Sequence, residues 1–211
     1  MVPILSWLFL KGKCRTCGAK IAARYPLVEA LEGILFVAVF QQYGLTLMTP
    51  LMWLFVAFLT VVFFIDVDHH IIPNKLVILG LVAGILPALF QWFSDYPLYY
   101  SEHFIEPFIG MLVPTALMFL VMLLSLLLFR ASGMGMGDVK VYLPIGLFLG
   151  WQLSLMSIWF AFFLGGIFGL YWIFILRKSK KDMIPFAPFI VIGCLISLLY
   201  GKYIFIFLLR A

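Results

Sequence analysis

Charged side chains are scarce in this chain: they make up 11% of its 211 residues, whereas hydrophobic residues make up 65%. Apolar residues account for roughly half of an average soluble domain. The mean hydropathy of +1.17 therefore excludes an ordinary soluble fold and indicates a polytopic membrane protein. Cysteine is scarce as well, with three residues, and Cys194 lies inside an apolar run, where we expect a packing role.

Apolar runs of roughly 20 residues recur along the chain and are long enough to cross a hydrocarbon core about 30 Å thick. Without barrel closure, only helices satisfy their own backbone in lipid. The sequence therefore predicts an all-α transmembrane bundle of about seven helices. We expect a cytoplasmic or interfacial segment at residues 1–25 and a transmembrane domain at 26–211, with helices at 26–43, 50–65, 73–93, 104–129, 138–151, 153–176 and 185–207.

The net charge of +5 does not indicate a nucleic-acid partner, because the basic residues lie at the edges of the apolar runs. Lys and Arg are enriched in the cytoplasmic loops of membrane proteins. If the seven expected helices alternate in direction, the basic segments all fall on one side, which places the N-terminus in the cytoplasm. These residues are Lys11, Lys13, Arg15, Lys20, Arg24, Lys75, Arg130, Lys140, Arg177, Lys178, Lys180 and Lys181.

A glycine-alternating loop precedes the fifth expected helix and ends in an acid: Gly133, Gly135 and Gly137 alternate with methionines before Asp138. An ionisable group at the edge of a lipid-spanning segment is costly and is by default a functional-site candidate. The glycines permit positive φ and close backbone approach, so a peptide substrate could lie against them. The alternative is a flexible turn in which Asp138 caps the next helix.

A second acid, Asp66, follows the apolar run of residues 51–65. The alternation of helices places Asp66 and Asp138 on the same cytoplasmic side. Two neighbouring carboxylates cannot both ionise readily, so they share one proton. One can then act as a base toward water and the other as an acid toward a carbonyl, which predicts aspartyl-protease chemistry without a metal or cofactor.

The basic loop before the first long helix carries Cys14 and Cys17 in a CxxC spacing. A tetrahedral zinc site needs four ligands, and one such pair supplies two. Zinc is therefore one interpretation of this half-site. The others are a redox pair and two ordinary loop thiols.

These features together resemble the type IV prepilin peptidases, the GxGD-type intramembrane aspartyl proteases. The likeness is carried by the CxxC loop and its exit into a helix (residues 5–29), by IDVDHHIIPN (65–74), by GMGMGDVK (133–140) and by GLFLGW (146–151). It spans most of the chain. The order of IDxDxxxxP and GxGD makes the resemblance specific.

The resemblance implies that Asp66 and Asp138 are the catalytic pair, with Asp68 as the alternative to Asp66 in the same segment. It also implies prepilin and pseudopilin substrates, cut on the cytoplasmic side of a bacterial inner membrane before a hydrophobic helix. The implied partners are these substrates and the lipid bilayer. We assign substrate binding to Gly135, Gly137, Asp68 and Lys140.

The chain departs from the bifunctional members of this family at three points. Those members begin with another membrane helix and carry an earlier CxxC that completes a four-cysteine zinc site, and neither feature is found in this sequence. The chain therefore corresponds either to a shortened form or to a short natural one. Those members also methylate the new N-terminus, but much of the region associated with that activity is missing here, so S-adenosylmethionine is implied only if this chain is bifunctional. Asn74 replaces an acid often found after this proline.

Two other classes of function compete with the protease interpretation. In an ion-coupled transporter, acids and broken helices bind an ion near the bilayer midplane, whereas the acids here lie at the ends of the expected helices. In a non-catalytic subunit of a pilus or secretion assembly, the two acids would be structural.

Gly165, Gly166 and Gly169 have no assigned chemistry and are expected to permit close helix packing.

Overall fold

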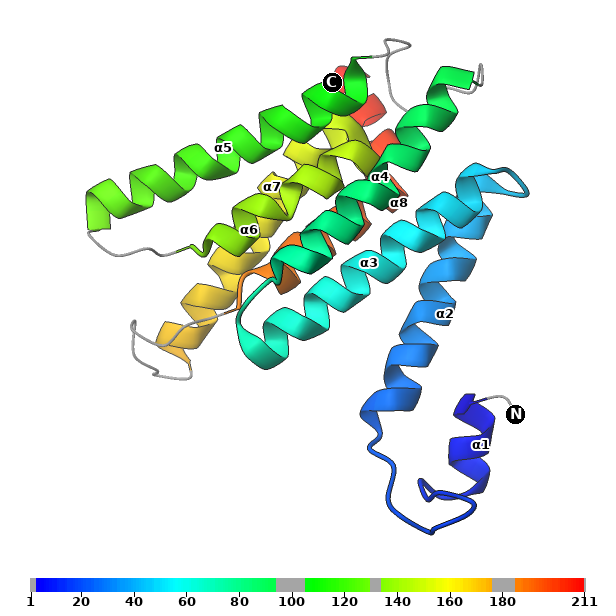
Figure 1. Ribbon diagram of the computed structural model, residues 1–211. Coiled ribbons are helices and arrows are strands. Elements are labelled where there is room, and N and C mark those ends of the chain that lie inside the picture. Colours follow the sequence, from blue (N-terminus) through cyan, green and yellow to red (C-terminus); the bar gives the residue numbers. More distant parts are fainter. Residues whose placement is uncertain (1–2, 94–104, 130–133, 176–184, 211) are drawn as a thin grey trace. The chain divides into compact units, whose positions relative to one another are not determined.

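The computed structural model describes residues 3–93, 105–129, 134–175 and 185–210. Within these ranges the regular structure is helical, apart from one isolated bridge between Lys13 and Lys20, so the all-α prediction is confirmed. The helices are α1 (Pro3–Phe9), α2 (Arg24–Tyr43), α3 (Met48–His69), α4 (Asn74–Phe93), α5 (Glu106–Phe129), α6 (Met136–Lys140), α7 (Tyr142–Phe174) and α8 (Ala187–Arg210) (Figure 1).

Several sequence-based predictions concern residues outside the described ranges. They include the first glycine of the alternating loop, the basic residues after the fourth and sixth expected helices, and the start of the fourth expected helix. The residues are Gly133, Arg130, Arg177, Lys178, Lys180, Lys181 and Phe104.

Four described helical stretches are long and apolar enough to cross a membrane: Met48–His69, Glu106–Leu128, Met136–Phe174 and Ala187–Phe205. The stretch Met136–Phe174 is interrupted at Gly150, whose backbone is not helical (φ 73°, ψ 178°). A backbone with this positive φ is readily adopted by glycine and is strained for other residues. The break lies at the predicted boundary between the fifth and sixth helices (138–151 and 153–176). Most of these two predicted helices therefore form one helix, α7, with a break at Gly150.

The chain divides into two compact units, Met1–Thr49 and Pro50–Ala211. In the first unit, the loop after α1 folds back on that helix. The indole N–H of Trp7 donates to the carbonyl of Ile21 (3.1 Å), and the N–H of Gly12 donates to the carbonyl of Trp7 (2.9 Å). Gly12 has a positive φ and lies close to the Trp7 ring, which favours glycine there.

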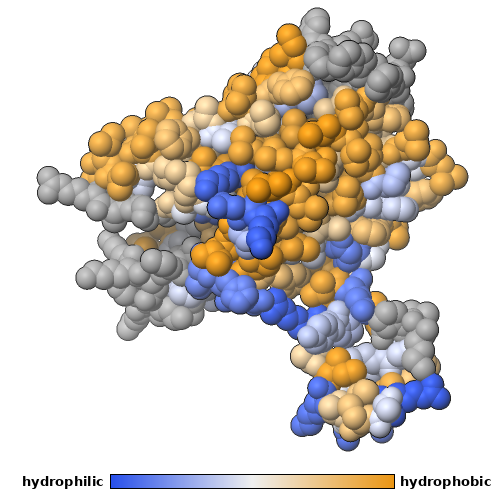
Figure 2. Space-filling view, viewed as in Figure 1, coloured by the Kyte–Doolittle hydropathy of each residue, from blue (hydrophilic) through white to orange (hydrophobic). Residues whose placement is uncertain are grey.

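The core of the second unit is formed by α3, α7 and α8. The rings of Phe55 and Phe148 stack with centroids 4.6 Å apart, which joins α3 to α7. Ile190 and Cys194 on α8 are fully buried, as expected for a packing cysteine. Apolar side chains cover most of the visible face of this bundle (Figure 2), which suits helices surrounded by lipid rather than water.

Glycines set the crossing of α5 and α7. A Cβ atom at Gly146 would collide with the backbone carbonyl of Gly110, and one at Gly110 would collide with the backbone of Gly146 and Gly150. Small residues of this kind let two membrane helices approach closely. Beside the crossing, the indole N–H of Trp151 donates to the buried carboxylate of Glu106 (3.3 Å), so α5 begins against the break in α7.

The close approach expected at Gly165, Gly166 and Gly169 is found only at the first of them. A Cβ at Gly165 would lie 3.1 Å from the ring of Phe186, whereas no described atom lies within 4 Å of a Cβ built at Gly166 or Gly169. The sequence prediction was wrong for these two positions because glycine permits close packing but does not select the partner.

We expect Gly146→Ala to lower the free energy of unfolding by about 1–3 kcal/mol, the usual cost of overpacking. The matched control is Gly166→Ala in the same helix, where the added methyl group meets open space and helix propensity favours alanine. Denaturant unfolding in detergent measures both variants. Equal stability of the two would contradict the glycine-mediated crossing.

Candidate active site

Asp66 lies in the last turn of α3, and only 5% of its surface is exposed. The helix ends just beyond it because His70 has a positive φ (54°) and donates its N–H to the Asp66 carbonyl (2.8 Å). Burial of a carboxylate requires compensating hydrogen bonds. The backbone N–H of Ala187, the first residue of α8, donates to Oδ2 of Asp66 at 3.0 Å.

Asp138 lies in the first turn of α6, with 7% of its surface exposed. Gly135 is the N-cap residue, and its backbone N–H donates to Oδ2 of Asp138 at 3.2 Å. The N–H of Asp138 in turn donates to the carbonyl of Gly135 (3.1 Å). Asp138 therefore does stabilise the start of a helix, as the capping alternative supposes, and is buried at the same time.

The structure brings the segments of these two acids together. Gly137 packs so closely on the residues after α3 that a Cβ there would lie 3.1 Å from Cβ of Ile72. The Nζ atom of Lys140 donates to Oδ1 of Asn74 at 3.2 Å, which joins α6 to the start of α4. These two contacts join the segment that carries Asp138 to the residues that follow Asp66.

Figure 1 shows these segments at one end of the bundle of residues 50–211. The end of α3, the start of α4, α6 and the start of α8 meet there, whereas α4 ends and α5 begins at the opposite end. This common location agrees with the prediction that Asp66 and Asp138 share a side. Carboxylates that lie close together share one proton, which is the arrangement needed to activate a water.

The other residues assigned to the site are placed differently. Asp68 is exposed, since residues two apart on a helix point in different directions, and this distinguishes it from the buried Asp66. Gly135 is exposed, and Gly137 is half-buried against Ile72. Lys140 is half-buried and bonded to Asn74, which the sequence did not suggest.

Ala187 is a site residue that sequence reasoning missed. Pro185 and Pro188 are a signal for the start of a helix, but nothing in the sequence indicates that this start meets Asp66. The contribution comes from a backbone N–H, which every residue except proline possesses. Composition or spacing therefore could not have identified it.

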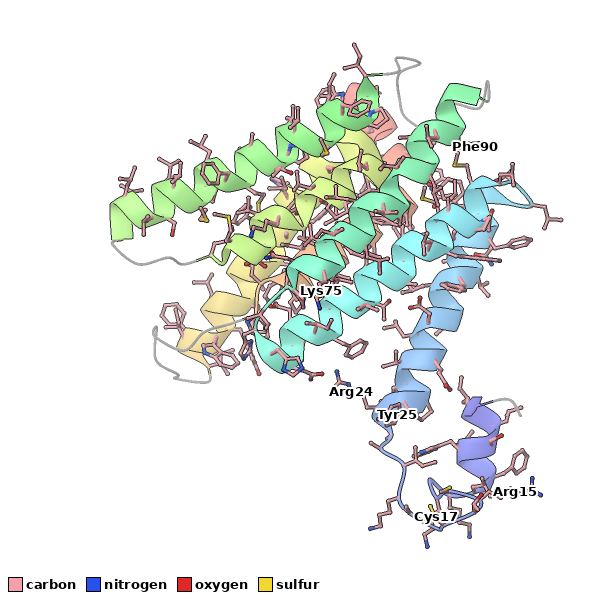
Figure 3. All side chains as sticks on the ribbon, viewed as in Figure 1. Arg15, Cys17, Arg24, Tyr25, Lys75 and Phe90 are labelled. Carbon is pink, nitrogen blue, oxygen red and sulfur yellow. The ribbon has the colours of Figure 1, made fainter. Side chains whose placement is uncertain are left out.

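The CxxC pair lies in the first unit, on the loop after α1, where Figure 3 labels Cys17 and Arg15. The pKa of the Cys14 thiol lies below its ordinary value, chiefly because the backbone N–H groups of Cys17 and Thr16 donate to its sulfur. A thiolate is the form that binds metal. Within the described ranges, no group of three or more His, Cys, Asp and Glu residues is placed to hold a metal ion. A tetrahedral zinc site built on this pair would therefore need two further ligands from outside these groups.

Comparison with known proteins covers both units. Residues 53–170 match the model of the type IV leader peptidase family, and residues 1–43 match that of the bacterial peptidase A24 N-terminal domain. No solved structure matches the chain.

Three similar relatives each bear the name prepilin leader peptidase/N-methyltransferase. The chain is 37% identical to the protein of Aeromonas salmonicida (strain A449) over 205 residues, 36% identical to that of Dichelobacter nodosus over 204, and 29% identical to that of Bacillus subtilis (strain 168) over 215. These matches cover 95%, 96% and 100% of the chain. They span 66%, 67% and 79% of the respective relatives.

We expect a double-mutant cycle of Lys140→Met and Asn74→Ala to give a coupling energy of about 0.5–1.5 kcal/mol in unfolding, the usual net value of a hydrogen bond. The control pairs Lys75→Met with Asn74→Ala, because Lys75 is the lysine next to Asn74 in the sequence and lies on the same helix, α4. Denaturant unfolding in detergent measures the cycle. Additive effects of the first pair would contradict the join between α6 and α4.

Proposed function

Because the chain belongs to the type IV leader peptidase family, we propose that it is a membrane aspartyl endopeptidase that removes the leader peptides of type IV prepilins and pilin-like proteins. The observation that carries this proposal is that Asp66 and Asp138 are both buried and that their segments pack together at one end of the bundle of residues 50–211 (Figure 1). The names of the relatives support the substrate class. The chain spans about two thirds of the length of the first of these relatives.

In the proposed reaction, a water molecule lies between Asp66 and Asp138, which share one proton. The ionised carboxylate takes a proton from the water as its oxygen attacks the scissile carbonyl carbon, and the protonated carboxyl donates to the developing oxyanion. Collapse of the tetrahedral intermediate breaks the C–N bond, and the leaving amine takes up a proton. Both acids are anchored by backbone N–H groups, so little reorganisation is required.

The proposed substrate approaches from the cytoplasmic side of a bacterial inner membrane. The exposed carboxylate of Asp68, one residue before the end of α3, would attract the basic leader, and the exposed backbone at Gly135 would let an extended peptide lie close. The apolar stalk of the pilin would remain in the lipid beside the bundle. The partners are therefore the prepilin and the bilayer.

The transporter alternative is less well supported. Its acids should lie near the middle of the membrane, whereas Asp66 lies in the last turn of α3 and Asp138 in the first turn of α6. The assembly-subunit alternative explains the hydrogen bonds of the two acids but not the burial of two carboxylates on adjoining segments, which costs free energy that a purely structural role would avoid.

We also propose that Cys14 and Cys17 supply two of the four ligands of a zinc site in the loop after α1. Zinc content of the purified protein, measured by mass spectrometry of the metal, is expected to fall to background in Cys14→Ser and in Cys17→Ser. The control Cys194→Ala, which removes a fully buried thiol, should keep the wild-type content. Equal zinc in all four proteins would refute the site.

Asp66→Asn and Asp138→Asn are each expected to lower the turnover of a purified prepilin by about 10²–10⁴-fold, the range attributed to general acid–base catalysis. Loss of the leader on a gel measures cleavage. Glu29→Gln, which neutralises an exposed acid on α2, is the control and should cleave like the wild type. Asp68→Asn is expected to keep turnover and to change KM, because its side chain is exposed.

Cleavage that persists in both Asp66→Asn and Asp138→Asn would refute the protease proposal. A loss of ion flux in proteoliposomes, with prepilins left uncut by the wild type, would favour the transporter. Adding S-adenosylmethionine to the same assay and weighing the product tests the second activity named in the relatives. A mass increase of one methyl group on the processed chain would show that the protein is bifunctional.

A further inference from the structure

The start of α8 lies against Asp66, far from it in sequence. We propose that the backbone N–H of Ala187 is a positioning group, which holds the Asp66 carboxylate through Oδ2 in its reactive orientation. This inference rests on the proposed protease function and adds to it a third segment of the active site. It gives a role to a helix that contributes no acid of its own.

The first turn of α8 explains why this N–H is available. The carbonyl of Phe186 accepts the N–H groups of Phe189 (3.0 Å) and Ile190 (3.3 Å), so Phe186 occupies the N-cap position. Phenylalanine has no side-chain oxygen with which to cap a helix, and Pro188 has no N–H to offer. Asp66 therefore plays the part of the capping side chain, supplied by α3 instead of by the residue before the helix.

Burial makes this hydrogen bond consequential. Ala187 is fully buried and Asp66 is 5% exposed, so water competes little for either atom. A carboxylate that accepts a backbone N–H makes a short, directional bond, and the N-terminus of a helix favours a negative charge. Because Ala187 engages Oδ2, the position of that oxygen is set by α8, and the other oxygen can be presented to a reactant.

The start of α8 is itself firmly packed on α7. The ring of Phe186 lies 5.4 Å from that of Phe162 and fills the space beside Gly165. The ring of Phe189, one turn along α8, lies 5.4 Å from that of Phe168. The amide of Ala187 is therefore held by a well-packed helix start, and a catalytic group is positioned precisely only when the element that supports it is well packed.

Ala187→Pro removes the N–H while keeping a residue that suits the first position of a helix. The matched control is Ala187→Val, which adds a side chain of similar size and keeps the N–H. On a purified prepilin, we expect Ala187→Pro to lower kcat by about 10- to 100-fold, as misplacement of a catalytic group does. We expect KM to stay within about twofold, because the bond acts on the acid and not on the substrate.

Because Ala187→Val keeps the N–H, its loss of kcat is expected to be at least about fivefold smaller than that of Ala187→Pro. Wild-type kcat in Ala187→Pro, or an equal loss in both variants, would overturn the inference. Thermal unfolding of both variants in detergent checks that each is folded. If Ala187→Pro does not fold, Asp66→Asn with selective 15N-alanine labelling provides a second measurement that does not depend on the proline variant.

In that measurement, the Ala187 amide signal of the wild type is assigned by its loss in Ala187→Val. Asp66→Asn is expected to shift this signal and to speed its hydrogen exchange, whereas Asp68→Asn should do neither. An Ala187 amide that does not respond to Asp66→Asn would refute the contact. A folded wild type that leaves prepilins uncut would instead refute the proposed function, while the amide signal would still decide the contact between Ala187 and Asp66.

Discussion

The free-energy cost of removing a carboxylate from water is the constraint on which the site depends. Asp66 and Asp138 are both buried, and each is compensated by a backbone N–H at the start of a helix, from Ala187 and Gly135 respectively. Helices α6 and α8 therefore begin where the acids lie. The same two bonds that make burial tolerable also fix the carboxylates in space, so stability and the proposed chemistry share one set of contacts.

Close backbone packing places α6, which carries Asp138, beside the end of α3, which carries Asp66. Gly137 lies against Ile72 on one side, and α7, which begins directly after α6, is held against α5 where Gly146 meets Gly110. The break at Gly150 lets the second half of α7 take its own direction toward the start of α8. These contacts form a continuous path from the α5–α7 crossing to both aspartates.

The first unit contributes a separate chemistry. Its loop after α1 carries the CxxC pair, and hydrogen bonds from the backbone to Cys14 favour the thiolate. The family match extends over this unit as well as over the bundle of the second. The proposed zinc site and the proposed proteolytic site therefore lie on different units of the chain and can be tested independently of each other.

The sequence by itself determined the helical class, most helix positions and the common location of Asp66 and Asp138. Span length and apolar content are local properties, and the alternation of direction follows from the order of the spans along the chain. It could not distinguish a cap from a buried acid at Asp138, which is both. Only the tertiary structure decided that Ala187 donates to Asp66 and that Gly110 and Gly146, rather than Gly166 and Gly169, mediate close packing. Every residue except proline has the same backbone N–H, and every glycine lacks a side chain in the same way, so neither feature indicates its partner in the sequence. The partner is decided when the helices pack.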